Sequence, residues 1–267
     1  MPNVSQIADL LEELRAKKPR VATISNAADS SHAANALLAL GAVPVMVLGN
    51  EEAAQVVAKT SSVALNTNAL HADVLNTMLK AAKAANASGV PVVLHAEGLS
   101  VSDFRNEGTT RILSETKVTV LRGSHLEISF LVTGKEVGST SLPEAMKEWA
   151  KAHRVILVAT GPTDYVTDGD DVFALRNGHP WMSLVSGAGS ELTGLIGAFC
   201  GTIPLPYGQK DIAAACVAAI TCANIAGEAA ALLASGPGSF QVNWFDALYQ
   251  LKTEMVRDRA RIEPLSV

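Results

Sequence analysis

The sequence lacks the Gly-Lys-Ser or Gly-Lys-Thr ending of a Walker phosphate-binding loop anywhere in its 267 residues. That absence excludes the P-loop class of nucleotide-binding proteins. Aromatic residues are also scarce, at 4%, and this favours helices packed on a sheet over an aromatic-rich β-sandwich. No cluster of lysine and arginine is interleaved with aromatics, and the net charge is −5 with a pI near 5.7. We therefore expect no nucleic-acid partner.

Cysteine is rare as well, with three in the chain: Cys200, Cys216 and Cys222. Their number is odd, and their spacing matches neither a zinc site nor a redox motif. We expect them to be reduced and buried, as is usual in the cytosol.

Long apolar runs typical of targeting or membrane segments are missing too. The N-terminal stretch 1–18 has no apolar signal core. The longest apolar region, 212–234, is rich in alanine and interrupted by Asn224 and Glu228, which favours a buried helix over a membrane span. We expect a soluble cytoplasmic protein that binds no membrane.

Hydrophobic residues make up 48% of the chain, enough for a well-buried core, and their pattern alternates between strand and helix periods. Alternating strands and helices predict crossover units and a mainly parallel sheet covered on both faces, in one domain. Buried strands are expected at 20–25, 44–48, 62–66, 91–95, 118–122 and 155–160. Helices are expected at 4–18, from 33 to Gly41, from 50 to 59, and in a long stretch to about 88.

The last hundred residues follow a different pattern. Two β-like runs surround Asp168 and Gly169, which predicts a hairpin. After it, helical periodicity predicts three helices, at 191–200, 211–235 and 240–257.

Gly187, Ala188 and Gly189 directly precede the first of these helices, and Ser190 follows them. A glycine turn before a helix presents unpaired N–H groups and the positive end of the helix dipole, which suit a phosphate. A dinucleotide-binding fingerprint is disfavoured because Leu192 occupies the place of its third glycine. Two interpretations remain: an anion hole for phosphoryl transfer, or a structural helix start with Ser190 as a capping residue.

Four blocks in register carry a resemblance to a known family. They read ISNAADSSHAANALLALGAVPVM (24–46), TGPTDYVTDG (160–169), NGHPWMSLVSGAG (177–189) and GEAAALLASGPGSFQVNWFDALYQL (227–251). In this order they resemble the hydroxyethylthiazole kinases of thiamine salvage, members of the ribokinase-like superfamily. The resemblance spans nearly the whole chain.

The resemblance implies a three-layer α/β/α ribokinase-like fold with a mostly parallel central sheet, as one kinase domain over residues 1–267. It implies ATP and Mg²⁺ as cofactors and phosphorylation of the primary alcohol of 4-methyl-5-(2-hydroxyethyl)thiazole. It also implies a homotrimer with substrate sites between subunits.

Specific residues match the family's functional positions. Arg122 and Thr160 fall at ATP-binding positions, and a guanidinium matches phosphate oxygens well. Glu127 falls at the position of the magnesium-site glutamate. Taken without the family, Arg122 would be read as a strand-end arginine in a surface ion pair, and Glu127 as a surface charge on a helix.

Substrate and transition-state contacts follow from the same resemblance. Asn26, Met46 and Gly187 fall in segments that bind the thiazole. Gly187 through Gly189 are expected to form the anion hole beside the catalytic position, Ser190.

The sequence departs from the family at several of these places. His95 stands where the family usually has a magnesium-site aspartate, and an imidazole is a poor ligand for a hard cation. Glu97, two residues on, is a possible replacement. Ser124 and Ala27 replace a usual asparagine and a frequent aromatic.

Ser190 is the sharpest departure, because the family commonly has cysteine there. A serine hydroxyl is far less acidic than a thiol and cannot act as a base at neutral pH without a partner. Phosphoryl transfer depends mainly on positioning and charge stabilisation, so the kinase remains our leading hypothesis. The alternatives are a weakened or inactive paralogue that binds a small heterocycle, and a kinase for a related alcohol.

Overall fold

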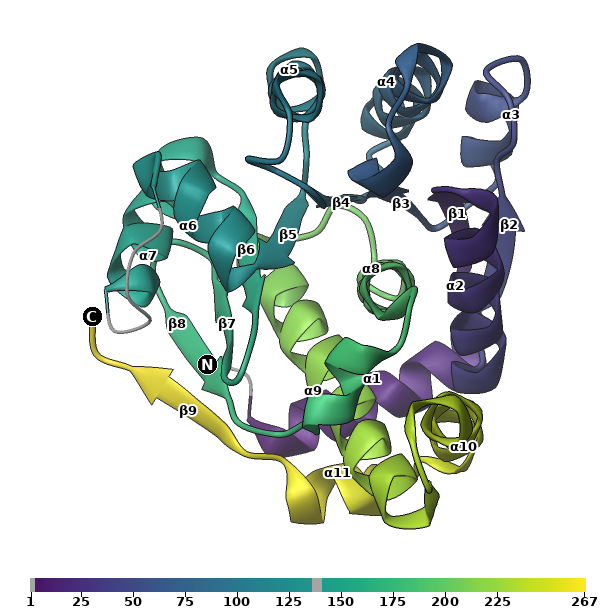
Figure 1. Ribbon diagram of the computed structural model, residues 1–267, viewed down its shortest axis with the longest axis vertical. Coiled ribbons are helices and arrows are strands. Elements are labelled where there is room, and N and C mark those ends of the chain that lie inside the picture. Colours follow the sequence, from purple (N-terminus) through teal and green to yellow (C-terminus); the bar gives the residue numbers. More distant parts are fainter. Residues whose placement is uncertain (1–2, 136–140) are drawn as a thin grey trace.

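The computed structural model describes residues 3–135 and 141–267, and its strands form one nine-stranded sheet (Figure 1). The strands run in the order β2-β1-β3-β4-β5-β6-β7-β8-β9. They comprise β1 (Arg20–Ile24), β2 (Val43–Met46), β3 (Ser62–Asn66), β4 (Val92–His95), β5 (Val120–Ser124), β6 (Ile156–Thr160), β7 (Asp164–Thr167), β8 (Val172–Leu175) and β9 (Ile262–Leu265).

The first six strands pair in parallel, and β7, β8 and β9 extend the sheet antiparallel. The mostly parallel sheet predicted from the alternating pattern is therefore confirmed. Because the six strands are parallel, their carboxyl ends meet at one edge, where open α/β sheets bind ligands.

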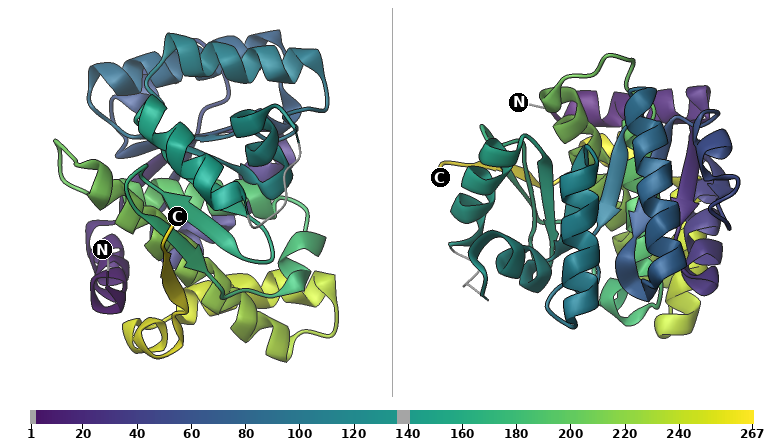
Figure 2. Two further views of the ribbon diagram at one scale, coloured as in Figure 1. Left: turned by 90° about the vertical axis from the view of Figure 1, so that its left-hand side faces the viewer. Right: turned by 90° about the horizontal axis from the view of Figure 1, so that it is seen from above.

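Helices cover both faces of this sheet, giving three layers (Figure 2). They comprise α1 (Val4–Lys17), α2 (Ala27–Leu40), α3 (Ala53–Val57), α4 (Ala72–Ala87), α5 (Asp103–Glu115), α6 (His125–Thr133), α7 (Leu142–His153), α8 (Ala188–Cys200), α9 (Gln209–Leu233), α10 (Pro237–Gln250) and α11 (Thr253–Arg259), with short 3-10 turns η1 (Thr67–Ala69) and η2 (Pro180–Leu184).

Successive residues of each strand face opposite sides of the sheet, so the core consists of two clusters, one on each face. In β1, Val21 packs into the cluster under α1, α2, α8, α9 and α10, whereas Ala22 packs into the cluster under α3 to α7. The same alternation holds in β6, where Val158 and Leu157 lie on opposite faces. Strands buried on both faces need nearly continuous apolar sequence, which explains runs such as 62–66 and 155–160.

The predicted hairpin is confirmed as β7 and β8, with Gly169 at a φ of +90° in the turn. Two sequence predictions need correction, and one strand was not predicted. The segment 44–48 is an edge strand with Met46 48% exposed, because nothing pairs beyond β2 among the described residues. The helix expected at 240–257 is two helices, α10 and α11, separated at Leu251 and Lys252. Strand β9 was not foreseen, since its four residues carry a proline and a glutamate.

The apolar region 212–234 forms most of α9. By length and composition α9 could cross a membrane, yet 72% of its most apolar window is buried inside the protein. It contacts α8, α10 and the sheet, so it is a core helix here, as predicted. All three cysteines are buried as free thiols.

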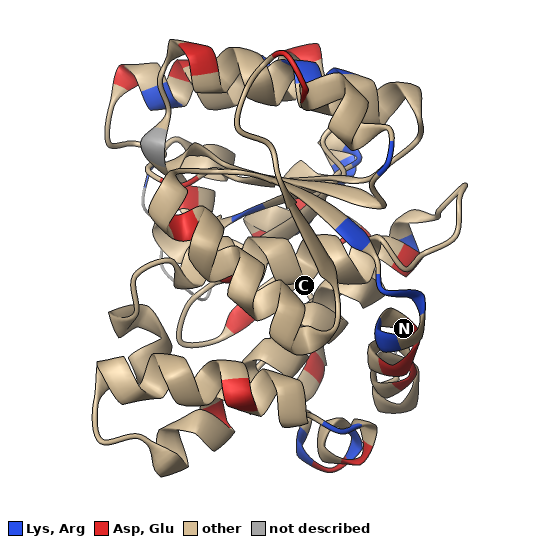
Figure 3. Cartoon of the chain, turned by 90° about the vertical axis from the view of Figure 1, so that its right-hand side faces the viewer, with Lys and Arg blue, Asp and Glu red and all other residues tan. Residues whose placement is uncertain are grey.

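Charged residues of both signs are interspersed along the helices on the side drawn in Figure 3. Their ion pairs are mostly exposed, as in Lys83–Glu115 at 2.7 Å and Arg257–Asp9 at 2.8 Å. Pairs of this kind contribute roughly 0–1 kcal/mol each, so the apolar core carries the fold.

Candidate active site

A cavity of about 690 Å³ opens at the carboxyl edge of the parallel strands. Residues from β4, β5 and β6 line one side of it, and residues from η2, α8 and α9 line the other. Its lining comprises His95, Glu97, Arg122, Ser124, Glu127, Thr160, Gly161, Pro162, Asp164, Arg176, Asn177, Gly178, His179, Pro180, Met182, Ser183, Ala188, Gly189, Leu192, Asn224 and Trp244.

Arg122 joins the sheet to the start of α8. Its Nη1 donates to the carbonyl of Gly189 at 2.6 Å and to Thr193 Oγ1 at 3.0 Å, and its Nη2 donates to Thr160 Oγ1 at 3.1 Å. The side chain is 3% exposed, which overturns the reading of a surface ion pair. Burial lowers the pKa of Arg122 to about 10, so it stays charged at neutral pH. Its Nε is buried with no protein partner among the described residues.

His95, at the end of β4, is a buried neutral imidazole. Its Nδ1 lies 3.2 Å from Arg122 Nη1. Burial and the Arg122 charge hold the pKa of His95 well below its usual range. Its ring lies between two carboxylates, with Nδ1 3.4 Å from Glu97 Oε2 and Nε2 3.9 Å from Glu127 Oε2.

Glu127 is not the surface charge that the helical pattern alone suggested. It forms a capping box at the start of α6, since Oε2 accepts from the Ser124 N–H at 2.7 Å and from the Ser124 hydroxyl at 2.9 Å. Oε1 accepts from the Gly98 N–H at 2.7 Å. These bonds fix the carboxylate at the cavity wall.

Glu97 is the more exposed of the two carboxylates, at 39% of its side chain. Burial raises the pKa of Glu97, as do the nearby charges of Asp29 and Glu127, while a hydrogen bond from Asn66 lowers it. That bond joins Asn66 Nδ2 to Glu97 Oε2 at 2.8 Å. The side chain predicted as a replacement for the missing aspartate therefore faces the same cavity as Glu127.

The helix predicted at 191–200 begins earlier, at Ala188, so that Ala188 and Gly189 lie in the first turn of α8 and not before it. Gly187 is the N-cap at a φ of +84°, a left-handed conformation that favours glycine. Gly189 allows close approach to the sheet, because a β-carbon built on it would lie 2.8 Å from His95 Cε1. The first N–H groups of a helix lack intrahelical acceptors, so α8 directs donors at the cavity.

Ser190 is not a capping residue but a buried hydroxyl in a polar cluster. Its Oγ donates to Asp29 Oδ2 at 3.2 Å and lies 3.4 Å from Ser25 Oγ. Asn66 Nδ2 donates to the same oxygen, and Asn68 Nδ2 donates to Asp29 Oδ2. We call Ser25, Asp29, Asn66, Asn68 and Ser190 the serine cluster.

Sequence reasoning missed four members of the serine cluster: Ser25, Asp29, Asn66 and Asn68. A usable signal was present for Asn66 and Asn68, since Asn66 ends a buried strand and Asn68 comes soon after it, at the edge where parallel strands place ligand-binding side chains. Asp29 carried no such signal, because an acid in the first turn of a helix is ordinary.

Thr160 and Asp164 also line the cavity. Asp164 accepts from the Gly161 N–H at 3.0 Å and from Asn224 Nδ2 at 2.7 Å. Burial raises the pKa of Asp164 to about 6, although these two bonds and Arg122 oppose the shift. Asp164 therefore ties the turn after β6 to α9.

None of the three predicted substrate residues, Asn26, Met46 and Gly187, is among the residues that line the cavity, and neither is Ser190. Asn26 caps α2, where its side chain accepts from the Asp29 N–H at 2.9 Å. Met46 ends the edge strand β2, two strands away from β3. The substrate roles of all three remain predictions.

Glu191, next to Ser190, is fully buried. Its Oε1 is 3.5 Å from Gln241 Nε2 on α10, and its Oε2 has no partner among the described residues. Burial, aided by the Asp29 charge, raises the pKa of Glu191 to about 8. The side chain is therefore a neutral acid at pH 7.

This raised pKa predicts a pH-dependent stability that glutamine would remove. Between about pH 4.3 and pH 8, Glu191 holds a proton in the folded chain that it has lost in the unfolded chain. The free energy of unfolding therefore falls as the pH rises, by up to about 1.4 kcal/mol per pH unit. We expect the melting temperature of E191Q to match that of the parent near pH 5 and to exceed it by about 5 °C or more at pH 8. Calorimetry across this range, with the exposed E12Q as control, measures the difference. A constant difference contradicts the assignment.

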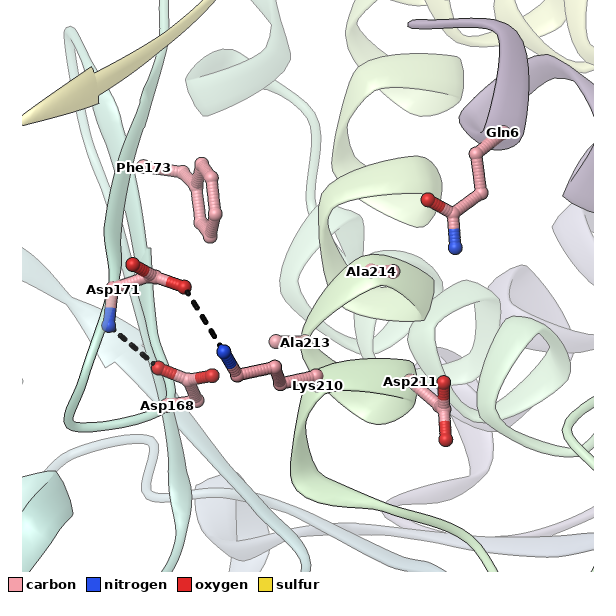
Figure 4. A pocket seen from close by; sticks show the side chains of 8 residues that line it. All are labelled: Gln6, Asp168, Asp171, Phe173, Lys210, Asp211, Ala213 and Ala214. Atoms are coloured by element: carbon pink, nitrogen blue, oxygen red, sulfur yellow. Dashed lines mark hydrogen bonds and ion pairs between the residues drawn. The ribbon is translucent and has the colours of Figure 1, made fainter. Parts of the chain in front are cut away.

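A second, smaller pocket of about 90 Å³ lies between the β7–β8 hairpin and the start of α9 (Figure 4). Asp168 Oδ1 accepts from the Asp171 N–H at 2.8 Å, and Lys210 Nζ lies 3.9 Å from Asp171 Oδ2. These contacts join the hairpin to α9, so the charged residues that line the pocket serve to connect two elements of the fold.

Comparison with known proteins gives consistent matches. Residues 11–254 match the model of the hydroxyethylthiazole kinase family. The curated hydroxyethylthiazole kinase of Thermoanaerobacter pseudethanolicus is 37% identical over 265 residues, covering 96% of this chain and 98% of that protein.

Solved structures match as well. The structure of a hydroxyethylthiazole kinase protein from Pyrococcus horikoshii superposes with a TM-score of 0.90 at 33% identity, over 97% of this chain and 99% of the other. A pyridoxal kinase from Staphylococcus aureus in complex with ADP has a TM-score of 0.57 at 14% identity, over 76% of this chain and 85% of the other, and shares the fold alone.

Proposed function

Because this chain belongs to the hydroxyethylthiazole kinase family, we propose that it transfers the γ-phosphoryl group of ATP to the hydroxyethyl alcohol of 4-methyl-5-(2-hydroxyethyl)thiazole in thiamine salvage. The fold is the α/β architecture shared with ribokinase-like kinases, as expected from the resemblance. Full-length similarity to kinases does not favour the alternative of an inactive paralogue.

The observation that carries the proposal is the contact between Arg122 and the start of α8. A buried, charged guanidinium donates to the Gly189 carbonyl and holds the glycine turn against the sheet. The helix N-terminus and the guanidinium together concentrate positive potential at one end of the cavity, where negative charge develops during phosphoryl transfer.

The rest of the cavity suits a nucleotide. Its volume of about 690 Å³ is within the usual range for ligand sites. Met182, Leu192 and Trp244 supply an apolar wall for a base, while Thr160 lies beside the guanidinium. We propose that the phosphates point toward Arg122 and Gly189, with the adenosine along the apolar wall.

The donor set fits Mg²⁺ through Glu97 and Glu127. Mg²⁺ typically takes one or two protein carboxylates and completes its shell with waters and phosphate oxygens. Both oxygens of Glu127 already accept hydrogen bonds, so we expect it to hold a metal-bound water, and His95 to contribute no ligand. When bound, the cation neutralises charge on the phosphates.

We further propose that the thiazole binds on the β1 side of Ser190, near Asn26 and Met46, in a homotrimer. The edge at β2 supports this proposal because Val43, Met46 and Leu48 are 36%, 48% and 85% exposed. An exposed apolar sheet edge is usually covered by a partner. Sedimentation equilibrium measures the oligomeric state.

The buried thiols support a cytoplasmic location.

The test of the proposed function is ADP release from MgATP by the purified protein, with and without the thiazole alcohol. We expect release that depends on the thiazole and stops when EDTA removes the metal. Release with a different heterocyclic alcohol would change the substrate but retain the chemistry. A folded protein that binds neither nucleotide nor thiazole would overturn the proposal.

A further inference from the structure

The hydroxyl of Ser190 is already hydrogen-bonded as a proton relay requires. It donates to the Asp29 carboxylate at 3.2 Å and accepts from the Asn66 amide. A hydroxyl has one proton to donate and two lone pairs. Asn66 uses one lone pair, and Ser25 Oγ, 3.4 Å away, has Asn68 Oδ1 as the acceptor for its own proton. One lone pair of Ser190 therefore remains for the alcohol of a bound substrate.

Asp29 is held in place from several sides. Its backbone N–H donates to Asn26 Oδ1 at 2.9 Å at the start of α2, and Asn68 Nδ2 donates to its Oδ2. Arg105 Nη2 donates at 2.6 Å to the Asn68 carbonyl and so orders the short turn that carries this amide. The Asp29 side chain is 7% exposed, and water has little access to it.

Ser190 and Asp29 lie between the nucleotide cavity and the position proposed for the thiazole. Asn66 donates both to Ser190 and to Glu97, which lines the nucleotide cavity. Gly189, the residue before Ser190, also lines that cavity. An alcohol within reach of Ser190 is thus next to the anion hole at the start of α8.

We propose that Asp29 is the base of the reaction, acting through Ser190 as a two-proton relay. The inference rests on the proposed function. The alcohol oxygen forms a bond to the γ-phosphorus while the bond from that phosphorus to the bridging oxygen breaks and ADP leaves. The alcohol proton passes to Ser190 Oγ as the Ser190 proton passes to Asp29 Oδ2. Asp29 ends as a neutral acid and later releases the proton to solvent.

The neighbouring acids do not serve this role. Glu191 points toward Gln241 on α10 and is protonated at pH 7. Glu97 has no hydrogen bond to Ser190; it is bonded to Asn66 and lies beside His95. Of these carboxylates, Asp29 contacts the Ser190 hydroxyl.

The test separates the relay from a structural role by exploiting the thiol that the family commonly has at position 190. We expect D29N and S190A each to lower kcat about 10²- to 10³-fold, with the Kd for MgATP changed less than threefold. The double variant D29N/S190A should lose little more, because the two residues act as a unit. The kcat of D29N/S190C should be at least tenfold higher than that of D29N. A helix N-terminus lowers the pKa of a thiol, so the thiolate can itself accept the alcohol proton.

The matched control is D73N, an exposed first-turn aspartate of α4, which should retain parental kcat. If Asp29 served only to position α2, D29N and D29N/S190C would be equally slow, and that result overturns the relay. Parental activity of D29N overturns it as well. A parent protein without thiazole-dependent ADP release overturns the proposed function, and the relay with it.

A measurement on the parent enzyme keeps the relay testable if D29N does not fold. The rate constant of single-turnover phosphoryl transfer is measured in mixtures of H₂O and D₂O. If two protons move in the transition state, this rate constant should depend quadratically on the deuterium fraction. A linear dependence, or none, contradicts the two-proton relay.

Discussion

Replacing Arg122 with lysine should lower kcat/KM for MgATP about a thousandfold. A lysine ammonium has its three donors on one nitrogen and lacks the rigid planar fork with which two guanidinium nitrogens reach the Gly189 carbonyl and Thr160. Arginine contacts to a transferring phosphoryl group are worth roughly 10³–10⁵ in rate. Steady-state kinetics with saturating thiazole measure the loss.

The control for this variant is R111K on α5, where the side chain is half exposed and pairs with Glu115 at 3.1 Å. An exposed pair of this kind contributes little, so R111K should be within twofold of the parent. R122K within tenfold of the parent, with the protein folded, would show that Arg122 supports the fold and does not bind phosphate.

Replacing Gly187 with alanine should move the N–H groups of this turn out of place and lower kcat about 10²- to 10³-fold, an effect of the size seen when one preorganised anion donor is lost. Two physical reasons add here. The φ of +84° is strained for alanine, by about 1–2 kcal/mol. The new β-carbon would also lie 2.4 Å from His32 Nδ1, a nitrogen that is 3.0 Å from the Ser186 carbonyl in the same turn.

Two further variants separate these reasons. G134A places alanine at a φ of +74° after α6 with no atom within 4 Å of its β-carbon, so it reports backbone strain alone and should leave kcat unchanged. H32A/G187A removes the 2.4 Å contact with the ring nitrogen but leaves the β-carbon of residue 32 at 3.1 Å, so it should recover part of the lost kcat. If G187A keeps full kcat, the turn at Gly187 is a structural helix start and not an anion hole.

Much of the fold could be predicted from local pattern. Apolar runs alternating with helical periods gave the parallel sheet with helices on both faces, and Asp168-Gly169 gave the hairpin. The edge position of β2 could not be read this way, because a strand's exposure depends on which strands pair beside it. The break between α10 and α11 was hidden for a similar reason, since helical periodicity continues across Leu251.

The site was predictable where its residues are close in sequence and not where they are distant. Gly187, Gly189 and Ser190 form one turn, so their sequence determined a helix start that can bind an anion. His95, Arg122 and Thr160 were visible as strand ends, and parallel strands bring such ends to one edge. Their burial and the neutral state of His95 depended on packing.

By itself, then, the sequence determined the strand and helix alternation, the glycine turn and the family resemblance, since each depends on residues near one another or on matching blocks. Only the tertiary structure decided that a carboxylate accepts the Ser190 proton in a hydrogen bond, because Asp29 lies 161 positions away. Strand order places the start of α2 beside the start of α8, and that order is set by how whole elements bury their apolar faces. No local pattern records it.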